Sequence, residues 1–383
     1  MDKRVYLDHA ATTPLDTQVL EQMLPYLKEK FGNASSLHSW GQEARAAVDH
    51  AREQVSQVLN CQPQEIIFTG TTTESDNLAI VGVAKASLSK GNHLITSPIE
   101  HHGALDVFEA LSKNGFEVTY LSVDEYGLVD PFEIEQSIKE TTTLVNVMYA
   151  NNEVGTIEPI EEITKITKKR GVAFHTDAAA AKYLDLDVQK LGVDLMTLGP
   201  HKFYGPKGIG ILYVRKGTKI ESVIKGGAHE YGLRPGTENV PAIVGAARAL
   251  QLLDEGKQKD AERISKFRDK LIDGVLQKIP NSRLTGHPEK RVPDIASFVV
   301  EGAEGESMLL LLDQEGIAAS SGSACTSGLL KPSHVLTAMG VSPELSHGSL
   351  RLSLGKDTTE EEIDYVLEKL PRIVERLREI APK

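Results

Sequence analysis

Short apolar runs alternate with longer amphipathic segments through the first half of the chain. The runs are rich in β-branched residues, as strands are, and the segments between them repeat apolar positions with a helical period. The predicted strands are residues 64–70, 93–100, 117–123, 143–153, 172–178, 194–200 and 208–217. The predicted helices between them are residues 73–91, 103–115, 130–140 and 160–171. This alternation predicts an α/β fold with a mainly parallel sheet flanked by crossover helices.

The pattern changes in the last third of the chain. Residues 241–276 have a long helical repeat, strand patterns follow at 295–300 and 349–354, and a charged amphipathic helix is predicted over 358–380. Residues 6–14, YLDHAATTP, read as strand-like at the other end. We predict a large domain at residues 15–255 and a smaller α+β domain formed by residues 1–14 and 256–383. Ligands of such sheets bind at the carboxyl ends of strands, so residues just after strands are the candidates for chemistry.

Composition excludes several classes of protein. The chain has 383 residues, 40% of them hydrophobic and 25% charged, as in a folded globular protein. A formal net charge of −12 argues against a dedicated nucleic-acid or anionic-membrane binder. We expect no membrane span and no signal peptide. The two cysteines, Cys61 and Cys325, favour a reducing cytoplasm, and no Cys/His cluster has the spacing of a metal site.

Lys202 is the first candidate for chemistry. It lies in LGPHKFYGPKGIG, residues 198–210, directly after a predicted strand. A loop lysine is ordinarily a solvated side chain, but the glycines Gly205, Gly208 and Gly210 allow close backbone packing here. A lysine amine with a lowered pKa can bind an aldehyde cofactor covalently.

Asp177 ends another predicted strand, 25 residues before Lys202. An aspartate there is either a turn or helix-capping residue or the partner of the pyridine nitrogen of pyridoxal phosphate. Phosphate could bind at the start of the predicted helix in FTGTTTESDNLAI, where Thr72 and Thr73 add hydroxyl donors to the free N–H groups. The same segment also fits an ordinary capping box of Thr71 and Glu74.

Three more polar residues follow predicted strands or lie beside Lys202. His101 is placed to stack on a flat cofactor ring, although a single loop histidine is more often structural. His201 is a candidate for a hydrogen bond to phosphate. Asn152 is a candidate to hold a carboxylate or a ring substituent.

Cys325 and Arg351 belong to the predicted smaller domain. The small polar residues around Cys325, in AASSGSACTSG, predict a mobile loop on which a deprotonated thiol can act as a nucleophile. Cys61 stands at a helix–strand turn and reads as structural. Arg351 is either a surface arginine of an edge strand or a bidentate ligand of a substrate carboxylate. The loop 230–239 could reach a neighbouring subunit.

Ten motifs along the chain, taken in this order and spacing, resemble one family of enzymes. They are YLDHAATTP, FGNASSLH, TTESDN, IEHHG, NNEVGT, HTDA, HKFYGPKGIG, RPGTENV, SSGSACTS and LRLSLG. The family is the cysteine desulfurases, the NifS/IscS-like class of fold-type-I pyridoxal-phosphate enzymes, and the resemblance covers essentially the whole chain. It implies a fold-type-I architecture and a two-fold homodimer with active sites near the subunit interface.

The resemblance also implies roles in holding the cofactor, pyridoxal 5'-phosphate. Lys202 would bind it covalently, Asp177 would pair with its ring nitrogen, and His101 would stack on the ring and assist proton transfer. Its phosphate ligands would be Thr72, Thr73, His201 and, from the other subunit, Thr237.

The implied substrate is L-cysteine. Arg351, helped by Asn152, would bind its carboxylate, and Asn152 would also lie near the ring hydroxyl. Cys325 would accept the sulfur as a persulfide, with L-alanine as the other product. The persulfide would pass its sulfur to an iron–sulfur scaffold protein or another acceptor.

Two positions depart from the family's pattern. Family members usually carry glutamine three residues after the aspartate, where it hydrogen-bonds the cofactor's ring oxygen. Here that residue is Ala180, in a segment one residue shorter than usual. The usual serine two residues before the histidine of the HK pair is Gly199. Each lost hydrogen bond to a charged group costs about 1.5–3 kcal/mol, so we expect weaker cofactor binding but the same class of reaction.

Other functions stay open at this point. A lyase acting on selenocysteine or cysteine sulfinate would proceed without Cys325. A pyridoxal-phosphate transaminase would use the same cofactor. A degenerate member of the fold that only docks sulfur-transfer partners would account for the two missing cofactor contacts.

Overall fold

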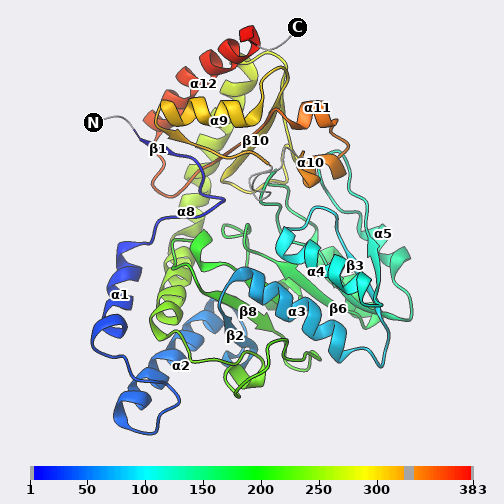
Figure 1. Cartoon of the computed structure of the whole chain (residues 1–383), viewed down its shortest axis with the longest axis vertical. Helices are drawn as coiled ribbons and strands as arrows, with labels where there is room; N and C mark the ends of the chain where they lie inside the picture. The colour runs from blue at the N-terminus through cyan, green and yellow to red at the C-terminus, as the bar shows by residue number, and fades with distance from the viewer. Residues whose placement is uncertain (1–3, 323–331, 381–383) are drawn as a thin grey trace.

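The structure, a computed structural model, describes residues 4–322 and 332–380 (Figure 1). Its larger part is built on a seven-stranded sheet. In spatial order the strands are β2 (Ile66–Thr69), β8 (Gly210–Val214), β7 (Leu195–Leu198), β6 (Ala173–Asp177), β5 (Thr142–Asn146), β3 (His93–Thr96) and β4 (Glu117–Tyr120). Strand β8 runs antiparallel to both of its neighbours, and the other pairs are parallel. The predicted mainly parallel mixed sheet is therefore confirmed.

Helices cover both faces of this sheet. They are α1 (Thr17–Lys28), α2 (Ser39–Leu59), α3 (Thr72–Ala86), α4 (His102–Lys113), α5 (Pro131–Ser137), α6 (Ile160–Arg170) and α7 (Val188–Leu191). Short 3₁₀ turns lie at η1 (Pro63–Glu65), η2 (Pro200–Lys202) and η3 (Glu230–Gly232). Among the described residues, no helix combines the length and the apolarity needed to cross a bilayer.

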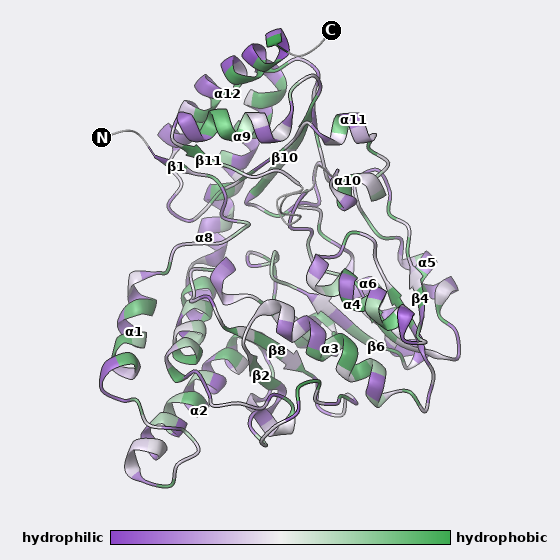
Figure 2. Cartoon of the chain, viewed as in Figure 1, coloured by the Kyte–Doolittle hydropathy of each residue, from purple (hydrophilic) through white to green (hydrophobic). Residues whose placement is uncertain are grey.

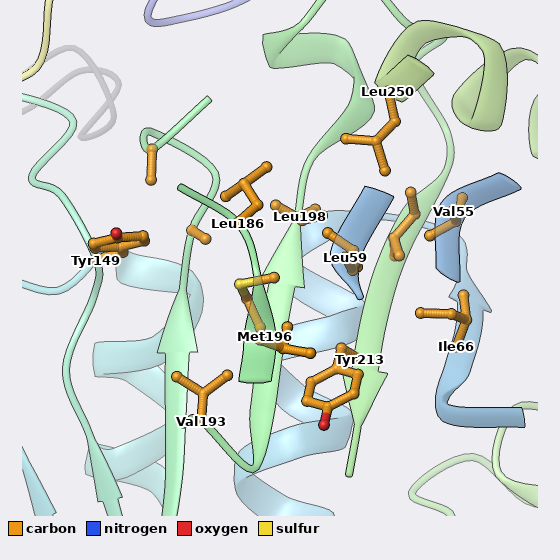
Figure 3. Packing of buried hydrophobic residues seen from close by; sticks show 14 of the residues in the cluster. Val55, Leu59, Ile66, Tyr149, Leu186, Val193, Met196, Leu198, Tyr213 and Leu250 are labelled. Carbon is orange, nitrogen blue, oxygen red and sulfur yellow. The ribbon is translucent and has the colours of Figure 1, made fainter. Parts of the chain in front are cut away.

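The strands contribute side chains to two separate core layers, one on each face of the sheet. Successive residues of a β-strand point to opposite faces, so alternate residues belong to each layer. The layer under α3 and α4 takes Ile67, Leu94, Leu144, Leu195 and Leu212. The opposite layer takes Phe68, Ile95, Val145, Phe174, Met196, Ile211 and Tyr213. Figure 3 shows Tyr213 and Met196 on neighbouring strands of this second layer, with Leu59 of α2 and Leu250 above them. Burial on both faces explains why these strands read as continuous apolar runs.

A smaller part has its own sheet and core. Strands β12 (Ser349–Ser353), β10 (Ile295–Val300) and β9 (Ser282–Leu284) form an antiparallel sheet in that order, and β1 (Val5–Tyr6) pairs in parallel with β11 (Ile317–Ala318). The helices here are α9 (Gly305–Gln314), α10 (His334–Ala338), α11 (Pro343–Ser346) and α12 (Glu360–Ile380). The residues of α12 that are buried recur every three or four positions, and its hydrophilic residues face outward (Figure 2).

One long helix joins the two parts. Helix α8 (Val240–Lys278) is continuous, and Figure 1 shows it running from the larger part into the smaller one. Its first half packs into the core of the large sheet and its second half, from Ile264 on, into the core of the smaller part. The domain boundary that we predict at residue 255 falls inside this helix.

The N-terminal segment differs from its strand-like pattern. Only Val5 and Tyr6 form a strand, and Asp8 makes an isolated bridge to Ser353 of β12. The backbone N–H of Ala10 then donates to the Ser353 hydroxyl instead of to a ladder partner. Leu7 is buried in the core of the smaller part, whereas the consecutive residues from Asp8 to Thr12 line a cavity.

Candidate active site

A cavity of about 640 Å³ lies between the two parts of the molecule. This size is within the range of small-molecule and cofactor sites. Its wall combines residues that follow strands of the large sheet, residues at the start of β10 and within β12, and the segment from Asp8 to Thr12. Four cationic and three carboxylate side chains line it, so charge of both signs is concentrated in one partly enclosed space.

Lys202 is held in this cavity by the N-terminal segment. Strand β7 ends at Leu198, and Pro200, which cannot donate to a strand ladder, opens the 3₁₀ turn η2 that contains Lys202. The Lys202 Nζ atom donates to the carbonyl oxygens of Ala10 at 2.7 Å and Ala11 at 2.9 Å. The amine is thus fixed in position by backbone groups about 190 residues away in sequence.

The N-terminus of α3 faces the same cavity through three threonines. Thr71 is the N-cap and accepts a hydrogen bond from the backbone N–H of Glu74. Glu74 does not complete the capping box with Thr71, because its carboxylate accepts from the N–H of Gly70 instead. Thr72 and Thr73 follow in the first turn, and the Thr72 hydroxyl is buried without a partner among the described residues. A helix N-terminus with a spare hydroxyl donor suits a phosphate.

Gly199 explains part of the departure from the family pattern. A Cβ atom at Gly199 would lie only 2.6 Å from the Thr72 Oγ1 atom, which is closer than real Cβ contacts. The backbone of Gly199 is extended, with φ −111° and ψ 96°, so its conformation does not demand glycine. The Thr72 hydroxyl therefore occupies space that a serine at position 199 would need.

Asp177 and His101 face the cavity from the ends of two strand segments. Asp177, the last residue of β6, accepts a hydrogen bond from the backbone N–H of Ala179 at 2.8 Å. Its carboxylate therefore also stabilises the turn that follows the strand. Burial raises the pKa of Asp177, and the Ala179 N–H and the charges of His101 and Lys202 oppose that shift. His101 caps α4, and its Nδ1 atom accepts from the N–H of Gly103 at 3.0 Å. This bond leaves the proton of a neutral His101 ring on Nε2.

His201 lies beside Lys202, and its Nδ1 atom pairs with the Thr12 hydroxyl at 3.1 Å. Burial, together with the nearby charges of Lys202 and Lys207, lowers the pKa of His201 to about 4. The ring is therefore neutral at pH 7 and can offer a hydrogen bond but no charge.

Arg351 is the main polar residue that the smaller part contributes. It lies on β12, an edge strand, yet only 4% of the residue is exposed, so it is not a surface arginine. Its Nη1 atom donates to the carbonyl of Asn152 at 2.8 Å and its Nη2 to the carboxylate of Asp8 at 3.1 Å. Its Nε–H is buried without a partner among the described residues. A carboxylate in the cavity would satisfy this donor.

Sequence reasoning missed three residues of the cavity wall. Asp8, which pairs with Arg351, was named only within a motif. Lys182 and Asp294 form an ion pair of 2.7 Å, and each side chain is only 3% exposed. A signal for Lys182 was available, since it is a lone charge that follows four alanines just after a buried strand.

One predicted site residue that the structure describes, Thr237, does not lie in the cavity wall. Thr237 is exposed and does not line the cavity of its own chain, which leaves its predicted role across a subunit interface untested. Cys325 lies outside the described residues, and so its predicted role also stays a prediction. The other cysteine, Cys61, is half-buried just after α2, and burial raises its pKa to about 12.

The remaining predicted residues fit pyridoxal phosphate. The cavity brings together an amine (Lys202), a helix N-terminus with an unpaired hydroxyl (Thr72), a carboxylate at a strand end (Asp177) and a buried N–H without a partner (Arg351). These match the aldehyde, the phosphate, the ring nitrogen and the substrate carboxylate in chemical type. No cluster of His, Cys, Asp or Glu suited to a metal ion is found in the part of the chain that the structure describes.

Comparison with known proteins gives one consistent result. The sequence pattern of the Aminotransferase class-V family matches residues 5–366. A protein of Dictyoglomus turgidum named cysteine desulfurase IscS is 49% identical over 383 residues, which cover 100% of this chain and 97% of that protein. A protein of the same name from Methanosarcina thermophila is 50% identical over 382 residues, covering 100% and 94%.

Solved structures agree with these relatives. A NifS-like protein has a TM-score of 0.92 and 40% identity, over 98% of this chain and 100% of its own. A structure titled SspA in complex with cysteine has a TM-score of 0.82 and 35% identity, over 93% of this chain and 100% of its own. These likenesses confirm the predicted architecture of the fold.

Proposed function

The chain belongs to the Aminotransferase class-V family and is a pyridoxal-phosphate-dependent cysteine desulfurase, and we propose that the cavity around Lys202 is its active site. The single observation that carries this assignment is the convergence of Lys202, Asp177 and Arg351 on one cavity from three separate elements. Those side chains are an amine, a carboxylate and a guanidinium, which the cofactor and an amino-acid substrate require.

Each residue then has a stated task toward the cofactor. When bound, pyridoxal phosphate supplies an electron-withdrawing ring that stabilises negative charge at the carbon next to the substrate's nitrogen. Lys202 holds the cofactor covalently, with its Nζ atom already positioned by the Ala10 and Ala11 carbonyls. Asp177 pairs with the ring nitrogen. The phosphate ligands in this chain are Thr72, Thr73 and His201.

The substrate is bound from the side of the smaller part. Arg351 binds the carboxylate of L-cysteine through its Nε–H and a guanidinium N–H, while Asp8 and the Asn152 carbonyl fix its plane. Asn152 would also serve the cofactor's ring hydroxyl. His101 would stack on the cofactor ring, and it can donate a proton from Nε2 because its Nδ1 atom accepts the N–H of Gly103 at the start of α4.

Cys325 is the sulfur acceptor in this proposal. Its thiolate forms a bond to the sulfur of cysteine as the bond between that sulfur and the substrate's β-carbon breaks. The electron pair of the broken bond stays with the carbon fragment, which takes up a proton and leaves as L-alanine. The enzyme keeps the sulfur as a persulfide, so no external oxidant or reductant is needed for this step.

We further propose a homodimer that works in the cytoplasm and passes sulfur to an iron–sulfur scaffold protein or a similar acceptor. Three large apolar side chains near the start of α2 support a subunit contact there: Phe31 is 68% exposed, Leu37 91% and Trp40 53%. Such exposure is costly in a monomer. The scaffold acceptor rests on the likeness to proteins named IscS, and the location on the low cysteine count.

The test uses full-length enzyme loaded with cofactor and given L-cysteine without reductant. Alanine and protein-bound sulfane sulfur are measured for wild type, Cys325→Ala and the matched control Cys61→Ala. We expect equal amounts of alanine and persulfide in wild type and Cys61→Ala, and neither product in Cys325→Ala. Alanine that persists in Cys325→Ala would instead assign a lyase that does not use this cysteine, such as one acting on selenocysteine or cysteine sulfinate.

A further inference from the structure

A buried ion pair in the wall of the cavity has no task in the function proposed above. Lys182 Nζ lies 2.7 Å from Asp294 Oδ2, and both side chains are 3% exposed. Lys182 belongs to the loop after β6 of the large sheet, whereas Asp294 directly precedes β10 of the smaller part. The pair therefore lies between the two parts and faces the space where the cofactor is proposed to bind.

The hydrogen-bonding capacity of this pair is not used up. An ammonium has three N–H donors, and the one hydrogen-bonded or ionic partner that the described residues provide for Lys182 is Asp294. Asp294 Oδ1 is buried and has no partner there either. Burying a charged pair is expensive unless its remaining donors and acceptors are satisfied. An acceptor atom of a ligand in the cavity would satisfy the spare N–H donors of Lys182.

Lys182 is the charged hydrogen-bond donor in the part of the cavity wall formed by the loop after β6. His9 is 5% exposed, and its Nδ1 atom has no partner among the described residues. Burial lowers the pKa of His9 to about 4, and the charge of Lys182 contributes to that shift, so His9 is neutral at pH 7. The other cations of the cavity, Lys202, Lys207 and Arg351, belong to other elements.

Ala180 lies two residues before Lys182 and lines the same cavity. It stands where related enzymes usually carry the glutamine that bonds the cofactor's ring oxygen. An alanine offers no donor, and this loop is one residue shorter than usual. Lys182, in the same loop, therefore places a donor in the cavity wall where Ala180 offers none.

We propose that Lys182, held by Asp294, donates the hydrogen bond to the ring oxygen of bound pyridoxal phosphate that an amide at position 180 would otherwise supply. This inference rests on the proposed function. It makes Lys182 a cofactor-binding residue and Asp294 the residue that positions it. The donor to the ring oxygen is then the cationic ammonium of Lys182 instead of a neutral amide.

The cation has a spectroscopic consequence. A nearby ammonium favours whichever form of the bound cofactor carries more negative charge. The pH midpoint of the cofactor's visible absorption change is therefore lower than a neutral donor would give. Removing Lys182 moves that midpoint upward.

The experiment compares three variants of the full-length enzyme with wild type. Lys182→Met/Asp294→Leu removes the donor and its partner together, which avoids an unpaired buried charge. The triple variant adds Ala180→Gln to that pair. The control is Lys190→Met/Asp185→Leu, which removes an exposed pair of 3.0 Å. Each protein is stripped of cofactor, checked by circular dichroism and thermal unfolding, and titrated with pyridoxal phosphate; its absorption is then followed against pH.

We expect the double variant to bind pyridoxal phosphate roughly 10- to 100-fold more weakly and to have a higher pH midpoint. We expect Ala180→Gln to restore most of the affinity but not the midpoint, because an amide supplies a hydrogen bond without a charge. The control should match wild type in both.

Two results overturn the inference. One is a folded double variant with unchanged affinity and midpoint. The other is a loss of affinity for pyridoxal phosphate that Ala180→Gln does not relieve. Lys182 and Asp294 would then serve only to join the two parts of the molecule. Failure of wild type to bind pyridoxal phosphate, or to release alanine from cysteine, would overturn the proposed function as well. Normal wild-type behaviour beside an unaffected double variant would overturn this inference alone.

Discussion

Two groups of residues line the same cavity but are positioned by different forces. The threonine group, Thr71, Thr72, Thr73 and His201, sits on strand ends and helix starts of the large sheet. The ion-pair group consists of Asp8 with Arg351 and Lys182 with Asp294. The first group offers neutral donors placed by backbone geometry, and the second offers charges placed by pairing across distant segments.

This difference indicates how each group can change. A neutral hydroxyl can be moved to a neighbouring residue if the backbone leaves room, as Thr72 and Gly199 show. A buried charge cannot be moved without its partner, because an unpaired buried ion costs far more than a lost hydrogen bond. Changes in the ion-pair group should therefore have larger effects than changes in the threonine group.

The largest effect is expected for Arg351→Ala. It removes the proposed carboxylate ligand and leaves Asp8 without its cation, so kcat/KM for L-cysteine should fall roughly 30-fold or more, mainly through KM. Steady-state kinetics with loaded enzyme measure this loss. The control is Arg283→Ala on the exposed position of β9. An unchanged KM in a folded Arg351→Ala enzyme would remove Arg351 from the substrate site.

A smaller effect is expected in the threonine group. Thr72→Ala should weaken binding of pyridoxal phosphate about tenfold through loss of one hydroxyl donor. Gly199→Ser alone should also weaken it, because its Cβ would lie 2.6 Å from the Thr72 hydroxyl. The double variant Thr72→Ala/Gly199→Ser should recover most of the affinity, since it exchanges the position of one hydroxyl.

Fluorescence titration of the cofactor-free enzymes with pyridoxal phosphate measures the binding free energy of wild type, both single variants and the double variant. The loss of binding free energy in the double variant should be smaller than the sum of the two single losses by about 1 kcal/mol or more. Gly256→Ser is the control, because its Cβ would meet its nearest atom at an ordinary 3.6 Å. Additive losses would show that Thr72 and position 199 act independently.

The smallest effect is expected for Glu153, a buried carboxyl that belongs to neither group but feels the charge of Arg351. This carboxyl is 5% exposed and accepts a hydrogen bond from the Ser333 hydroxyl at 2.5 Å. Burial raises its pKa to about 7, against the opposing effects of Ser333, Arg351 and His102. The folded state thus binds the proton more tightly than the unfolded state, and stability falls as pH rises from about 4.5 to 7.

Glu153→Gln should remove that part of the pH dependence and make the protein about 1 kcal/mol more stable at pH 8, with little change at pH 4.5. Urea unfolding of both proteins at the two pH values measures the difference. Glu375→Gln, on the exposed face of α12, is the control. An equal difference at both pH values would show that Glu153 does not titrate in this range.

Much of the fold was predictable because its signals are local. The apolar runs that became β2, β3, β5, β6, β7 and β8 are buried on both faces, and α8 and α12 show clear helical periods. The residues after these strands, including His101, Asp177 and Lys202, were predicted as site residues from their positions alone, and all three line the cavity. Their roles with cofactor and substrate remain proposals.

The N-terminal segment shows where local signals fail. Residues 6–14 alternate like a strand, but the strand that pairs with β11 ends at Tyr6. Leu7 is buried in the core of the smaller part, and Asp8 to Thr12 line the cavity. The pairing partner of a short edge segment depends on what the rest of the chain offers. A pattern of alternating residues cannot specify that partner.

The sequence by itself determined the elements, the order of the motifs and the family, since hydrophobic periods and motifs are properties of neighbouring residues. The tertiary structure alone decided which charges meet. Asp8 and Arg351 are 343 residues apart, and Lys182 and Asp294 belong to different parts of the molecule. Such pairs form because burial makes an unpaired charge costly, and burial at these positions exists only after the two parts have packed together.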